Sequence, residues 1–69
     1  MPFANLKIPA GTVTAEQKHD LVEQVTTMYT NLFGEHARPN TMVLVDEVAD
    51  GGWGIGGDVL TLAKLRGPS

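Results

Sequence analysis

Apolar and polar residues alternate along the first strand-like segment of the chain. The apolar set lies at even positions, at Ala4, Leu6 and Ile8. The residues between them are Phe3, Asn5 and Lys7. A period of two is typical of a β-strand with one buried face, and the following Pro9-Ala10-Gly11 is a typical strand end. We therefore predict a strand over residues 3–8.

The next apolar residues are spaced three and four apart, which predicts an amphipathic helix over residues 15–33. They are Leu21, Val22, Val25, Met28, Tyr29, Leu32 and Phe33. Thr14 and Gln17 have the spacing of a capping box, in which each side chain bonds the other residue's backbone amide. Gly34 stands where a left-handed C-cap would end the helix.

A second apolar run, residues 41–48, follows a short loop over residues 35–40 and predicts a mostly buried strand. Strand, helix and strand form a βαβ unit, with parallel strands and a right-handed crossover. One helix covers only one face of a two-stranded sheet. The other face therefore needs burial by something outside this chain.

The segment Ala49–Asp58 contains five glycines in ten residues. Trp53 and Ile55 lie two positions apart within it, which argues against a flexible linker and predicts a small hairpin that lies on another subunit. Gly56-Gly57-Asp58 lacks the Lys-Ser/Thr ending of a phosphate loop, so a nucleotide site is not expected. Residues 59–65 are expected to form a last turn of helix or strand, and residues 67–69 to fray.

The length and composition predict one small α/β domain over residues 1–69 that associates with other copies of itself. A chain of 69 residues is marginally stable alone. It has no cysteine, so disulfides and thiolate metal sites are excluded, and its two histidines do not have a recognised metal-binding spacing. A hydrophobic fraction of 42% is enough for a core and an apolar interface.

The charge distribution argues against nucleic-acid and membrane partners. The net charge is −3 and the five basic residues are scattered, with no basic run. No apolar stretch approaches the roughly 20 residues of a membrane span, and the N-terminal segment does not resemble a signal peptide. A cytoplasmic location is the expectation.

Pro2 is the candidate catalytic residue. Methionine before a small residue is normally removed after translation, so the mature chain is expected to begin with a proline. A free N-terminal proline is a secondary amine that acts as a base without a cofactor. A chain-terminal amine has a pKa of about 8, and burial in an apolar pocket lowers it towards neutrality. The alternative is that proline at this position has no special role.

Four features coincide: Pro2 at the start of a strand, the βαβ unit, the short chain and Trp53-Gly54-Ile55-Gly56-Gly57-Asp58. Together they resemble the tautomerase superfamily, specifically its short 4-oxalocrotonate tautomerase-like group, over residues 2–61. The resemblance implies cofactor-free proton transfer on a small carbonyl or enol substrate, with Pro2 as general base. It also implies that Trp53 lines an apolar pocket, and that subunits assemble as dimers, trimers or hexamers.

Two arginines of the best-known family members are missing here. Thr12 stands directly after the glycine that ends the first strand, and Met42 stands early in the second strand. In the family, those arginines bind a substrate carboxylate, so a dicarboxylate such as 2-hydroxymuconate is expected to be a poor substrate. Arg38 and Lys7 are the candidate replacements, and a solvated surface position is the alternative for each.

Other residues have two readings each. Ile8 and Ile55 are candidates for the pocket wall or for core packing. Asn5 is a candidate donor to a substrate carbonyl or to a structural partner. His19 is expected in solvent, and His36 either in solvent or near a neighbour's pocket.

Three functions remain open. The first is a keto–enol tautomerase acting on a 2-oxo acid or a phenylpyruvate-like compound. The second is a proline-dependent lyase or dehalogenase, which would need a carboxylate to activate water. Asp46 and Glu47 are adjacent on a strand, point to opposite faces and cannot form a carboxylate pair within one chain. The third is a non-catalytic oligomeric binding or scaffold protein.

Overall fold

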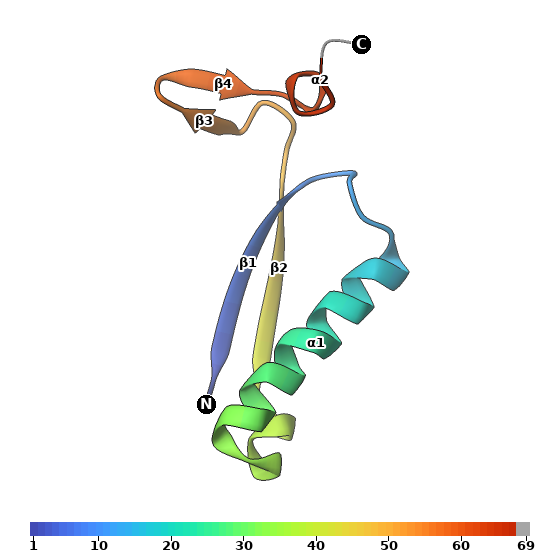
Figure 1. Cartoon of the computed structure of the whole chain (residues 1–69), viewed down its shortest axis with the longest axis vertical. Coiled ribbons are helices and arrows are strands. Elements are labelled where there is room, and N and C mark those ends of the chain that lie inside the picture. The colour runs from blue at the N-terminus through green and yellow to red at the C-terminus, as the bar shows by residue number, and fades with distance from the viewer. Residues whose placement is uncertain (68–69) are drawn as a thin grey trace.

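The computed structural model describes residues 1–67, which form a βαβ unit followed by a small arm (Figure 1). The elements are β1 (Phe3–Pro9), α1 (Ala15–Phe33), the 3-10 helix η1 (Glu35–Asn40), β2 (Met42–Val48), β3 (Trp53–Ile55), β4 (Asp58–Leu60) and α2 (Leu62–Leu65). The predicted α/β class, βαβ unit and C-terminal hairpin are confirmed. Fraying was expected over residues 67–69: Gly67 donates a 3.2 Å hydrogen bond to the Lys64 carbonyl, and residues 68 and 69 lie outside the described residues.

β1 and β2 form a parallel sheet whose register runs from Phe3 opposite Met42 to Pro9 opposite Val48. α1 lies along one face of this sheet (Figure 1). That face contains Ala4, which is 9% exposed, and Glu47, which bonds Lys18 of α1. The opposite face has no cover within the described chain. It carries the exposed apolar side chains Phe3, Met42 and Leu44.

Both ends of α1 follow from local sequence. The Thr14 hydroxyl accepts a hydrogen bond from the Gln17 amide at 3.1 Å, and the Gln17 side chain accepts one from the Thr14 amide at 2.9 Å, as a capping box requires. At the other end Gly34 has φ 102° and ψ 163°, so the predicted left-handed C-cap is wrong. The chain extends at this glycine because it turns directly into η1, which replaces the predicted loop.

The arm is a two-stranded hairpin with a tight turn at its tip. β3 and β4 pair antiparallel with Ile55 opposite Asp58, which leaves Gly56 and Gly57 as a two-residue loop. Their φ values are 58° and 87°. Positive φ at both central residues is the requirement of a type I′ turn, whose twist matches that of the strands.

A single copy of this chain is elongated and has little core. Its radius of gyration is 15.3 Å, against about 11 Å for a compact chain of this length. Its accessible surface is 5076 Å², against roughly 4,200 Å² for a folded monomer of this mass. Among the described residues, the buried apolar ones are Ala4 and Ala37. The incomplete sheet and the extended arm fit self-association.

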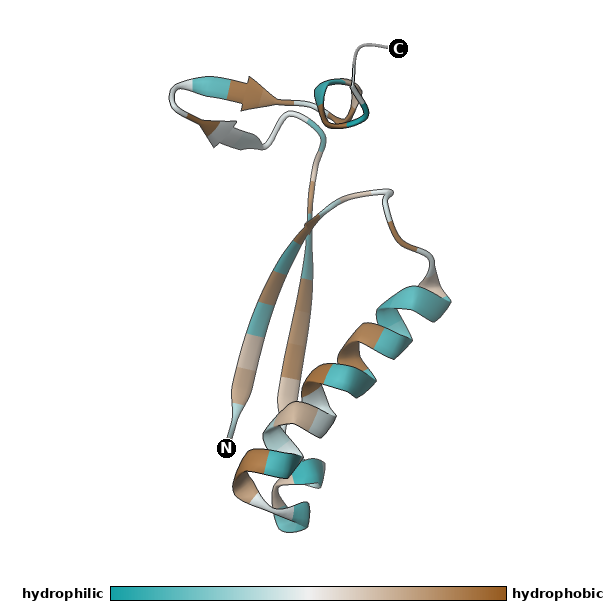
Figure 2. Ribbon diagram, viewed as in Figure 1, coloured by the Kyte–Doolittle hydropathy of each residue, from teal (hydrophilic) through white to brown (hydrophobic). Residues whose placement is uncertain are grey.

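The hydropathy of α1 is mixed along its length. Figure 2 shows polar and apolar segments following one another along the helix. Met28, Leu32 and Phe33 leave apolar surface exposed in its C-terminal half. None of the helices in residues 1–67 combines the length and the apolar character needed to cross a membrane.

Candidate active site

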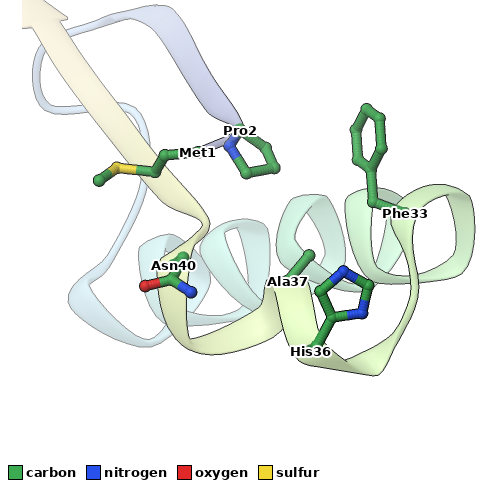
Figure 3. Close-up of a pocket in the computed structure, with 6 residues that line it drawn as sticks. All are labelled: Met1, Pro2, Phe33, His36, Ala37 and Asn40. Carbon is green, nitrogen blue, oxygen red and sulfur yellow. The ribbon is translucent and has the colours of Figure 1, made fainter.

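Pro2 lies in a hollow of about 400 Å³ beside the start of the sheet (Figure 3). The hollow is lined by Met1, Pro2, Phe33, His36, Ala37 and Asn40. These residues come from the chain start, the end of α1 and the following η1. They meet because both strands of a parallel sheet begin at the same edge, so the segment before β2 lies next to the segment before β1.

The backbone holds Pro2 at this edge. Its carbonyl oxygen accepts a hydrogen bond of 2.9 Å from the Met42 amide, at the first residue of β2. The Pro2 nitrogen is joined to Met1 in a peptide bond, whose resonance withdraws the lone pair and leaves no base. Because Met1 also lines the hollow, its removal would free the amine and widen the space in front of it.

Lys7 and Arg38, the two candidate replacements for the missing arginines, are held by other partners. The Lys7 ammonium lies 2.6 Å from Asp46 on the uncovered face of the sheet. The Arg38 guanidinium extends towards α1, where it donates to Thr27 at 2.9 Å and to Glu23 at 3.3 Å. Neither side chain lines the hollow around Pro2.

The three predicted wall residues also lie outside this hollow in a single chain. Ile8 is half-buried on the face of β1 that α1 covers. Trp53 is half-buried in the arm, and its Nε1 is enclosed without an acceptor among the described residues. Ile55, near the tip of the hairpin, is 66% exposed. The hollow around Pro2 in a single chain therefore contains none of these three residues.

Two side chains of the hollow were not assigned to it from the sequence. No sequence pattern points to Asn40, and the sequence leaves His36 either in solvent or near a neighbour's pocket. The structure places both beside Pro2 of the same chain. The available signal was topological: residues just before the second parallel strand must lie near the start of the first.

The acidic pair of β2 is separated as predicted. Asp46 bonds Lys7 on the uncovered face, whereas Glu47 accepts a hydrogen bond of 2.7 Å from Lys18 of α1. The Lys18 hydrogen bond is the main reason that the pKa of Glu47 lies below its ordinary value of 4.5, and the Gly11 amide acts in the same direction. Glu47 thus fastens the helix to the sheet.

The remaining polar candidates lie at the surface. Asn5 is exposed on the uncovered face of the sheet, in register with Leu44. His19 is exposed on α1, with its Nδ1 3.9 Å from an Asp20 carboxylate oxygen.

A family model described as "Tautomerase enzyme" matches residues 2–63. The chain belongs to the tautomerase family. It is 43% identical to "Probable tautomerase K2" of Dickeya dadantii (strain 3937) over 61 residues, which cover 88% of this chain and 90% of that relative. It is 33% identical to a "Probable tautomerase" of Helicobacter pylori (strain ATCC 700392 / 26695) over 60 residues, covering 84% and 87%.

A solved structure from a study of the 4-oxalocrotonate tautomerase isozymes of Methylibium petroleiphilum superposes on this chain with a TM-score of 0.75. The two chains are 34% identical, and the match covers 97% of this chain and 100% of that one. The family and its fold are therefore those that Pro2 and the Trp53–Asp58 motif indicated. These relatives support a tautomerase-type function.

Proposed function

We propose that this protein is a cofactor-independent keto–enol tautomerase in which Pro2, freed by removal of Met1, is the general base. The observation that carries the proposal is the position of Pro2 in a hollow large enough for a small organic acid, in a member of the tautomerase family. A base at a fixed position beside the substrate is the requirement of general acid–base catalysis.

The proposed reaction moves one proton and needs no other reagent. The Pro2 amine takes the hydroxyl proton of an enol, and the electrons of that O–H bond form the C=O double bond. The electrons of the C=C bond then take the proton from the Pro2 ammonium at the neighbouring carbon. The product is the ketone, and the amine returns to its starting state.

The surroundings favour a small substrate with an apolar part. Phe33 supplies an apolar wall at the end of α1. The arm of a second subunit brings Trp53 and Ile55 to this hollow in our proposal, and closes it against water. Ile8 contributes to the wall only if that assembly opens the covered face of β1.

The missing arginines point to a substrate with fewer carboxylates than 2-hydroxymuconate. The Thr12 hydroxyl donates to the Pro9 carbonyl at 2.6 Å, so it is committed to the turn after β1. Met42 presents a thioether on the uncovered face of the sheet. For Lys7 or Arg38 to bind substrate, each would have to exchange an acidic partner for it.

The test is the ketonisation of phenylenolpyruvate, followed by ultraviolet absorbance, on protein whose intact mass shows that Met1 is absent. We expect Pro2→Ala to lower turnover by about 10² or more, as loss of a general base does. Undiminished activity in a Pro2→Ala protein that has fully lost Met1 would contradict the proposal. A trimmed, assembled wild-type protein without turnover would instead favour a binding or scaffold role.

A further inference from the structure

His36 is the one lining residue of the Pro2 hollow whose side chain can carry a positive charge. The other lining side chains are apolar or, at Asn40, an uncharged amide. Figure 3 shows the His36 imidazole on the η1 side of the hollow, near Phe33 and Ala37. Within residues 1–67 the His36 side chain makes no hydrogen bond or ion pair, so its ring nitrogens are free to donate to a ligand.

The basic side chains of the βαβ unit that could compete for this role are paired with carboxylates. Lys7 pairs with Asp46 and Lys18 with Glu47. Arg38, two residues from His36, is turned away towards Glu23. An anion that enters the hollow of a single subunit therefore meets His36 without having to displace an existing carboxylate from it.

The position of the imidazole depends on Gly34. This glycine has φ 102°, and a Cβ placed on it would lie 3.0 Å from both Nδ1 and Cε1 of His36. The absence of a side chain at Gly34 thus lets the ring lie against the backbone where α1 passes into η1. Such a contact limits the positions that an otherwise exposed imidazole adopts.

We propose that His36 binds the substrate's carboxylate and in this way takes the place of an arginine in this site. This inference rests on the proposed function. It assigns the substrate class as a monocarboxylate 2-hydroxyenoate or 2-oxo acid whose apolar tail lies against Phe33. A protonated imidazole donates a charge-assisted hydrogen bond to a carboxylate, and imidazole gains that proton within the physiological range. His36 is the one side chain lining the hollow that can carry a positive charge, which accounts for one carboxylate and not for two.

The binding test uses cinnamate, an aryl monocarboxylate with no proton to exchange through an enol. Met1-free protein is titrated at pH 6, where histidine side chains are ordinarily mostly protonated. The chain has two histidines, so the ring signals in proton NMR spectra report both at once. We expect cinnamate to shift the His36 signals and to leave those of His19 unmoved.

Variants then test the energetic role. We expect His36→Gln to weaken cinnamate binding about tenfold or more, the usual effect of losing a charge-assisted hydrogen bond. His19→Gln is the matched control and should bind as wild type does. Methyl cinnamate, which has no charge, should bind equally to wild type and to His36→Gln. The inference is overturned if His36→Gln binds cinnamate as tightly as wild type, or if wild type does not bind it at millimolar concentration.

Kinetics separate this inference from the proposed function. We expect His36→Gln to raise the KM for phenylenolpyruvate about tenfold, whereas Pro2→Ala lowers kcat. If His36→Gln loses cinnamate binding while the wild-type protein shows no turnover, the anion site is supported and the catalytic proposal is contradicted. If Pro2→Ala loses turnover while His36→Gln binds cinnamate normally, the catalytic proposal is supported and the anion site is contradicted.

Discussion

The Met42 amide donates a 2.9 Å hydrogen bond to the Pro2 carbonyl, so the first residue of β2 holds the proposed base at the edge of the sheet. This bond continues the parallel ladder one step before Phe3, beyond the residues that form β1. It uses only backbone atoms, so any residue other than proline at position 42 can donate it. The position of Pro2 at this edge therefore does not depend on the methionine side chain at position 42.

The peptide bond between Met1 and Pro2 gives the first prediction. Protein that retains Met1, obtained by inhibiting methionine aminopeptidase during expression, should show no turnover of phenylenolpyruvate, because an amide nitrogen is not a base. Treatment with the aminopeptidase in vitro should restore activity in proportion to the trimmed fraction seen by intact-mass spectrometry. Equal activity of the retained and trimmed forms would contradict a role for the Pro2 amine.

The Lys18–Glu47 pair predicts an acid-dependent loss of stability. Because the pKa of Glu47 is below 4.5 in the folded state, the pair contributes stability that is fully present above about pH 4.5. That contribution disappears as the pH falls through the lowered pKa and the carboxylate is protonated. We expect Lys18→Met to be less stable than wild type in urea at pH 7 and to approach wild type as the pH falls through the lowered pKa of Glu47.

Glu47→Gln is the matched variant for this pair. It should also be destabilised at pH 7, and progressively less so as the pH falls through the lowered pKa and the wild-type carboxyl itself becomes neutral. An equal destabilisation of Lys18→Met above and below that pKa would show that the aliphatic part of Lys18, rather than its charge, fastens α1 to β2.

The uncovered face of the sheet predicts where subunits meet. Leu44 is 47% exposed there, next to Asn5 on the neighbouring strand. Leu44→Lys should shift the protein towards smaller species in size-exclusion chromatography with light scattering, because an ammonium in an apolar interface loses its hydration. Asn31→Lys, on the exposed surface of α1, is the control and should assemble as wild type does. Unchanged assembly of Leu44→Lys would place the interface elsewhere.

The tight turn at the tip of the arm predicts that adding one methyl group at Gly57 destabilises the hairpin. Gly57 has φ 87° and no atom within 4 Å of a built Cβ, so Gly57→Ala introduces only backbone strain. A left-handed alanine costs about 1–2 kcal/mol, which should make amide hydrogen exchange in β3 and β4 about 5- to 30-fold faster. Gly54→Ala is the control, because its φ is not positive and its Cβ meets Asp58 at an ordinary 3.5 Å. Equal exchange in both variants would argue against a type I′ turn.

The elements of this protein were largely predictable because each depends on neighbouring residues. The alternation around Leu6 predicted β1. The three-and-four spacing of apolar residues, together with Thr14 and Gln17, predicted α1 with the first and last residues that the structure has. The glycine pair at 56 and 57 marked the hairpin. The geometry of Gly34 was mispredicted because it depends on η1, whose residues 35–40 have no periodic pattern to announce a helix.

Of the candidate site, the sequence indicates Pro2 but not the side chains that surround it. Pro2 and the Trp53–Asp58 motif are visible in the sequence, and they are sufficient to recognise the family. Which side chains surround Pro2 depends on the parallel pairing of Phe3 with Met42, which brings residues nearly forty positions apart to one edge. No local pattern encodes that distance, and none shows that Arg38 turns towards α1 while His36 lines the hollow. The sequence by itself determined the elements and the proposed base, whereas long-range strand pairing in the tertiary structure decided which groups that base can work with.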